Sequence, residues 1–547
     1  MPLVVLEADY SSRVIADSVS SLIFIVVFAL ALTCSQARLP NIQVPICFAG
    51  VPGAAIGIFV TAAEISRVLH LPVQVNPETF RILAGLTFVL SAIVCLRSRA
   101  RRDSLCKLRL LIPVLVVPTI VSTAILIVAS QNGLTPPGND VLNSGLIIDS
   151  QRRLHYSPIC QHGVTSDVHG LVDLRFEACG AWLLGDLFDL GVSSSILSNL
   201  LLPFLLTPFM LAAGLHSILK ALDITLSKAT HNLIAVSSVQ FLMFPWGTNG
   251  LPRFTLGLAL LLCSFGLLLG YLRGQKVLFL FVLNYIGILY VHVIPFLILT
   301  GGVLLVMLVC ERQILRRRAT LSVLSLLSAL FFVNSSDVFQ STRNITQIAL
   351  GDAYLQQLRS SPPLERETPS SVANSEPTLQ VLGILESAAR AGIQLALYVI
   401  CAVGVMKLLR SRESPKVLIA VMSLVLFIAD VLAGFEFSFF SRLFGERLRI
   451  TALSQLLLLV PVAIGLDAVL RSIAHNFVYR SLYRHAALTA VVVLLLTNVV
   501  AGLRIYSTAW ARQALPVAIE SSVVWTDEDI NINRESLLRW LSLIREK

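Results

Sequence analysis

Long apolar segments are the feature that most constrains how this chain can fold. A helix that crosses a bilayer needs roughly 20 mostly apolar residues, and such segments recur along the whole sequence of 547 residues. In lipid every backbone polar group must be satisfied internally, which segments of this length achieve as helices. We identify about fourteen of them, near 18–35, 44–63, 79–96, 110–129, 194–217, 231–245, 255–272, 277–292, 294–310, 319–334, 388–408, 416–434, 451–470 and 486–503. The sequence therefore predicts an all-α, polytopic transmembrane helical bundle.

The composition excludes the main alternatives to a membrane protein. The chain is 56% hydrophobic and only 14% charged, whereas an ordinary soluble domain is about 45–50% apolar and about 25% charged. A water-facing fold of this size needs more polar surface than that. A soluble globular enzyme and a disordered protein are both excluded.

Basic residues in short connections predict the orientation of the spans. Lys and Arg concentrate in three connections, at 97–109, 311–318 and 407–416. Cytoplasmic loops of membrane proteins carry this excess, and a count of fourteen spans places all three connections on one side. Both termini are then extracytoplasmic. The net charge of +10 follows from this bias, so we expect no nucleic-acid partner.

Four regions follow from the pattern of apolar and polar segments. Residues 1–334 form an N-terminal transmembrane block of about ten spans with a large outer loop at 130–193. Residues 335–387 form a flexible external connector, because they contain runs rich in Ser and Pro. A four-span C-terminal block at 388–503 and an external tail at 504–547 complete the chain.

The outer loop contains the first group of candidate functional residues. Asp140 and Asp149 are followed by His162 and His169, and such side chains beside a membrane surface suit acid–base chemistry or phosphate binding. The two histidines with Asp167 also suit a metal. A solvated loop with a few structural hydrogen bonds is the alternative interpretation.

Two cysteines share the same loop. Cys160 and Cys179 would lie in an oxidising outer compartment, where a disulfide between them is expected. Two unpaired thiols held apart by the fold are the alternative.

Three further outer positions combine aromatic, imidazole or guanidinium groups. Trp246 follows a helix-breaking Pro and suits either an interfacial belt or a lipid-facing pocket. His292 lies where two short spans meet, which makes it a functional candidate or part of a plain turn. The 434–449 loop interleaves Phe with arginines that suit phosphate or an amphipathic surface helix; the candidates are Arg442, Arg447 and Arg449.

Two carboxylates lie inside apolar segments. Asp430 and Asp467 are near the ends of their spans. Acids at membrane depth suit proton or ion coupling in a transporter, whereas acids close to a helix end more commonly cap the helix or reach the interface.

A series of short motifs runs in order along the chain. They are Pro136-Pro137-Gly138-Asn139-Asp140, Ser166-Asp167-Val168-His169-Gly170, Asn199 to Pro208, Phe244-Pro245-Trp246, Val291-His292-Val293-Ile294-Pro295 and Phe439-Phe440-Ser441-Arg442-Leu443. This order resembles a family of large, uncharacterised actinobacterial membrane proteins and, more distantly, the GT-C glycosyltransferases. The resemblance covers most of the chain.

The resemblance implies an enzyme on the outer face of a bacterial plasma membrane. It would move a sugar from a polyprenyl-phosphate donor to a cell-wall glycan or glycolipid acceptor. Asp140, or second Asp149, would be the base, the three arginines and His292 would bind the donor phosphate, and His162, His169 and Trp246 would orient the acceptor. Some GT-C members use a divalent metal and others none, so the cofactor stays open.

Other functions stay open beside the transferase. A polysaccharide polymerase or ligase is a second enzyme class, and a multi-spanning transporter or lipid flippase is the main rival from another class. A catalytically silent envelope-assembly protein is the last, since Asn143 and Ser441 depart from the motif residues of the family. We find no nucleotide-binding, zinc-hydrolase or serine-hydrolase motif.

Overall fold

The computed structural model describes residues 2–36, 44–68, 77–97, 112–131, 159–161, 176–178, 180–188, 196–226, 252–309, 398–411, 413–434 and 447–476. Across these ranges the chain is helical apart from one two-stranded hairpin and the short turns between helices. The chain divides into two compact units. The first unit is Met1–Thr342 with Leu488–Lys547, and the second unit is Arg343–Ala487.

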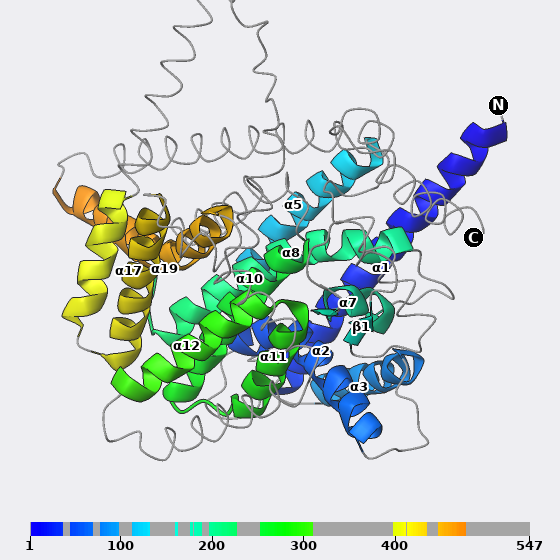
Figure 1. The fold of residues 1–547 in the computed structure, drawn as a ribbon, viewed down its shortest axis with the longest axis horizontal. Helices are drawn as coiled ribbons and strands as arrows, with labels where there is room; N and C mark the ends of the chain where they lie inside the picture. Colours follow the sequence, from blue (N-terminus) through cyan, green and yellow to red (C-terminus); the bar gives the residue numbers. More distant parts are fainter. Residues whose placement is uncertain are drawn as a thin grey trace, which may run out of the picture. The chain divides into compact units, whose positions relative to one another are not determined.

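The first unit is built from apolar helices of different lengths (Figure 1). They are α1 (Pro2–Gln36), α2 (Val44–Val68), α3 (Pro77–Arg97), α5 (Ile112–Gln131), α7 (Gly180–Phe188), α8 (Ile196–Ala221), α10 (Pro252–Leu272), α11 (Leu278–Val291) and α12 (Val293–Val309). A small antiparallel hairpin, β1 (Ile159–Gln161) with β2 (Phe176–Ala178), precedes α7. The second unit contains a helix at 398–410, α17 (Ser414–Gly434) and α19 (Arg447–Asn476).

Within the described ranges, five helices are long and apolar enough to cross a membrane. They are Ser12–Thr33, Pro45–Ala63, Pro77–Val94, Ser198–Ala221 and Phe254–Leu272. Four shorter apolar helices accompany them, at Val114–Ile127, Leu278–Val291, Ile294–Val306 and Pro415–Ile428. The prediction of a helical membrane protein is confirmed at this level. The predicted spans 231–245, 319–334 and 486–503 lie outside the described residues.

Helices α2 and α11 cross with their backbones in contact. A side chain added at Gly57 would clash with the carbonyl of Leu283, and one added at Gly287 would clash with the carbonyl of Gly53. Small residues allow this close approach, which drives helix packing where no hydrophobic effect operates between helices. We call the contact of α2 with α11 around Gly53, Gly57 and Gly287 the glycine seam.

Pro52 is the one residue that interrupts the hydrogen bonding of α2. At about 100° per residue, Gly50, Gly53 and Gly57 lie within about 60° of one another, whereas Pro52 lies at least about 100° away from all three. The proline ring is therefore on the side of α2 away from the glycine seam.

Helices α8 and α10 run side by side in the same direction. The thiol of Cys263 donates to the carbonyl of Met210 at 3.1 Å, and further along both helices Arg273 Nη2 donates to the carbonyl of Leu222 at 3.1 Å. The fourteen-span prediction gives this same direction, since it counts these helices as fifth and seventh. Helix α11 returns along α10, because Gly257 near the start of α10 lies against His292 after the end of α11.

Helix α3 contrasts with the buried helices α8 and α10. The most apolar 18 residues within Ser198–Ala221 are all buried, whereas only 17% of Pro77–Val94 is. The outward surface of α3 is formed by bulky aliphatic side chains, Ile82, Leu83, Leu86, Val89, Leu90, Ile93 and Val94. Lipid chains are as apolar as these side chains, so the surface is suited to a bilayer and unsuited to water.

The second unit also depends on glycines. A side chain at Gly404 would clash with the carbonyl of Pro461, and one at Gly465 with the carbonyl of Ile400, so the 398–410 helix and α19 touch through their backbones. Ser423 Oγ on α17 donates to the carbonyl of Leu457 on α19 at 3.2 Å. The glycines therefore let the 398–410 helix approach the backbone of α19 closely.

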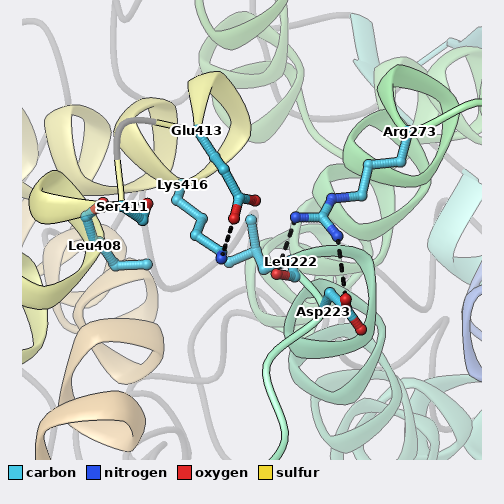
Figure 2. Close-up of polar contacts among 7 residues, drawn as sticks. All are labelled: Leu222, Asp223, Arg273, Leu408, Ser411, Glu413 and Lys416. Carbon is cyan, nitrogen blue, oxygen red and sulfur yellow. Dashed lines mark hydrogen bonds and ion pairs between the residues drawn. The ribbon is translucent and has the colours of Figure 1, made fainter.

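Polar contacts close two helix ends of the first unit (Figure 2). Asp223 follows α8 with φ 57°, and Gly274 follows α10 with φ 88°, the left-handed conformation that ends many helices. Arg273 donates to the Leu222 carbonyl and lies 3.9 Å from the Asp223 carboxylate. In the second unit, Lys416 pairs with Glu413 at 2.6 Å at the start of α17.

Candidate functional site

A buried carboxylate lies in the short helix α7. Asp186 is 5% exposed and sits in the otherwise apolar run Gly180–Phe188. Helix α7 packs against α1, α2, α3, α8, α10 and α11. An ionisable side chain inside an apolar helical bundle is costly and marks a functional site by default. Asp186 is therefore the first candidate that the structure adds.

Asn199 on α8 is the hydrogen-bonding partner of this carboxylate. Its Nδ2 donates to Asp186 Oδ1 at 2.8 Å, and Asn199 itself is 1% exposed. Gly185 makes the contact possible, because a Cβ there would clash with the Asn199 amide oxygen. The pair joins the last segment of the predicted outer loop to the first turn of α8.

Aromatic rings fix the end of α7 beside this pair. Phe188 is fully buried and its ring contacts those of Phe24, Phe28 and Phe80 at centroid distances of 5.7–5.9 Å. These three rings come from two helices, α1 and α3, which together hold the end of α7 in place. The predicted outer loop 130–193 therefore ends in a segment that is buried in the bundle, whereas its composition indicated a polar loop.

The polar pair and His292 lie at the same end of the first unit. Asn199 lies near the start of α8 and Phe254 near the start of α10. Because the two helices run in the same direction, both residues lie at one end of the unit. The ring of Phe254 meets the ring of His292 at 5.1 Å, edge to face. In addition, β2 of the outer-loop hairpin packs against α11, which ends at this same level.

His292 acts as a helix cap. It separates α11 from α12 in an extended conformation, and its Nδ1 accepts a hydrogen bond from the backbone N–H of Ile294 at 3.2 Å. The nitrogen that accepts this bond carries no proton, so it cannot donate to a phosphate while it caps α12. The predicted role of His292 in donor binding stays a prediction.

The other predicted site residues are only partly covered by the structure. Arg447 and Arg449 lie in the first turn of α19, and Cys160 lies in β1 opposite Glu177. The remaining predicted site residues lie outside the described residues: Asp140, Asp149, His162, His169, Cys179, Trp246 and Arg442.

Asp467 is paired within its own helix. Its carboxylate is 2.7 Å from Arg471 Nε, one turn later in α19, and the Asp467 side chain is buried whereas that of Arg471 is exposed. Helix α19 continues to Asn476, so Asp467 lies inside the helix, where Arg471 neutralises it locally. Asp430 lies in α17. The described ranges contain no group of three or more His, Cys, Asp or Glu side chains that could hold a metal.

Sequence reasoning did not find Asp186. The usable signal was the apolar run 181–188 inside a predicted polar loop, too short to cross a bilayer and interrupted by one acid. The sequence marks Asn199 only as part of a motif, and spacing along the chain does not identify its partner. Comparison of the chain with models of known protein families, with curated proteins and with solved structures finds no match.

Proposed function

We propose that the chain is a membrane glycosyltransferase of the GT-C type, with about fourteen spans and both termini outside a bacterial plasma membrane. It would transfer a sugar from a polyprenyl-phosphate donor to a cell-envelope acceptor on the outer face. The order of motifs from Pro136 to Leu443 is what suggests the reaction. Asp140 would accept the proton of the acceptor hydroxyl, and Arg442 would neutralise the growing charge of the leaving phosphate.

One structural observation supports this proposal most directly. The loop that carries Asp140 ends in a hairpin and in α7, and α7 is buried among six helices beside the Asp186–Asn199 hydrogen bond. A loop fixed at its end can keep reactive groups at a constant height above the membrane. Catalysis depends on such positioning, so a loosely attached loop would fit the reaction less well.

The test is transfer of label from a lipid-linked sugar. Membranes containing the full chain would be incubated with radiolabelled polyprenyl-phosphate mannose or polyprenyl-phosphate arabinose, and the label would be followed into lipid and glycan fractions. We expect Asp140→Asn to lower transfer at least about 100-fold, the scale of a lost general base. Asp173→Asn, in the same loop, is the matched control and should keep the wild-type rate.

A second function is favoured by the buried carboxylate itself. Asp186, buried among six helices, would suit a transporter that couples movement of its substrate to a proton or cation. If no donor gives transfer above control membranes, the transferase proposal fails. Proton uptake by liposomes containing the wild type, compared with Asp186→Asn, then tests the transporter.

A further inference from the structure

Asn284 is a buried polar residue in the glycine seam. Its side chain is fully buried, and neither its Oδ1 nor its Nδ2 has a hydrogen-bond partner among the described residues. Its amide lies against Gly53, where an added Cβ would clash with it. Buried amides are nearly always hydrogen-bonded to protein or to ordered water, so this one requires an explanation.

Thr61 repeats the observation on the facing helix. Its Oγ1 is also buried without a partner in the described structure, although a helical Thr can bond the carbonyl four residues earlier. Thr61 lies eight residues after Gly53 on α2, or about 12 Å along the helix. Because α2 and α11 run in the same direction, with Gly50 against Leu280 and Gly57 against Leu283, Thr61 lies nearer the end where α11 finishes.

That end is where α7 and its polar pair are placed. Helix α7 packs against both α2 and α11, and it carries Asp186 with Asn199 bonded to it. Polar groups therefore occur at successive levels, from α7, through Thr61, to Asn284 in the middle of α11. The carbonyls of Gly53 and Leu283 pack directly on the facing backbone at Gly287 and Gly57, so the side chains of Asn284 and Thr61, unpartnered among the described residues, are the polar groups open to a further partner.

We propose that water reaches the Asn284 amide along the edge of the glycine seam, from the end at which α7 lies. A buried water needs two to four polar partners, and the unpartnered Oδ1 and Nδ2 of Asn284 supply two. Water at this depth would hydrate the middle of a helix pair that composition alone describes as apolar. The inference does not depend on the proposed transferase, because it rests on the α2–α11 contact and on the position of α7 alone.

Cysteine accessibility tests the inference. Asn284→Cys and Thr61→Cys would each be made in the full chain and treated with a small, charged, membrane-impermeant methanethiosulfonate, which reacts with thiolates in water. Intact cells and inside-out vesicles would be labelled separately, so that either orientation of the bundle is covered. The modified residues would be located by peptide mass spectrometry.

Matched controls come from the same helices. Ile56→Cys on α2 and Ile288→Cys on α11 are as fully buried as Asn284, whereas Thr61 is half-buried, so the comparison with Asn284→Cys decides; native Cys263 is a buried control in every sample. We expect the Asn284 and Thr61 variants to react at least tenfold faster than these controls in one of the two preparations. Equal, slow reaction of Asn284→Cys and Ile288→Cys in both preparations would overturn the proposal.

A second variant covers the case in which Asn284→Cys does not fold. Asn284→Asp keeps the shape of the side chain and adds a group that water must solvate. In a hydrated seam it should accumulate in membranes to the wild-type level, whereas in a dry seam it should be lost. Loss of Asn284→Asp together with normal accumulation of Asn284→Leu would also contradict the inference.

Discussion

Asn199 Nδ2 donates a hydrogen bond of 2.8 Å to Asp186 Oδ1, and both side chains are buried. Asn199→Ala removes the donor and leaves a buried carboxylate with fewer partners. We expect this variant to lose about 1–3 kcal/mol of stability, the typical cost of an unsatisfied buried polar group. The measurement is thermal unfolding of the purified protein in detergent. An unchanged midpoint would mean that the bond adds nothing to the fold.

The glycine seam predicts a strong dependence on side-chain size. Gly57→Ala and Gly287→Ala each place a Cβ against a backbone carbonyl of the facing helix, so we expect a loss of about 1–3 kcal/mol from overpacking. Gly85→Ala is the matched control, because nothing lies within 4 Å of its added Cβ. It should be neutral or gain about 0.5–1 kcal/mol from helix propensity. An equal change in stability for all three variants would show that the seam does not limit packing.

Two substitutions of His292 distinguish a role as a helix cap from a role in phosphate binding. His292→Ala removes the acceptor for the Ile294 N–H and should cost about 1 kcal/mol. His292→Asn keeps an acceptor and should restore most of that stability. If His292→Asn also restores sugar transfer, the residue acts as a cap. Restored stability without transfer would favour the predicted contact with donor phosphate.

Substitutions of Arg273 and Gly274 test how much the helix ends shown in Figure 2 contribute to stability. Arg273→Gln loses the bond to the Leu222 carbonyl and should cost about 1 kcal/mol. Gly274→Ala forces a side chain into φ 88° and should cost about 1–2 kcal/mol. Lys416→Gln, at the ion pair with Glu413, is a control expected to change stability by about 0.3–0.5 kcal/mol.

The hairpin makes the predicted disulfide directly testable. Ile159, before Cys160, pairs with Ala178, which precedes Cys179, so the pairing brings the two chain segments together. We expect peptides containing Cys160 and Cys179 to be linked in a non-reducing digest and to separate after reduction. Alkylation of both thiols without prior reduction would contradict the bond.

The sequence was sufficient for the class of protein and for most helix positions. Long apolar segments leave few alternatives in lipid, because the backbone must satisfy its own hydrogen bonds. The predicted spans at 44–63, 79–96 and 255–272 accordingly lie within α2, α3 and α10. The basic connections gave an orientation, which stays a prediction. Apolarity is a property of each segment alone, so it can be read without a partner.

Only the tertiary structure decided which residues meet. Asp186 and Asn199 are separated by 13 positions and lie on different helices, and Gly57 meets Leu283 across more than 200 residues of sequence. Nothing in the local pattern distinguishes a glycine that admits a neighbouring backbone from Gly85, which faces open space. Helix contacts in a membrane are set by steric fit and by single polar groups, and these depend on both partners at once.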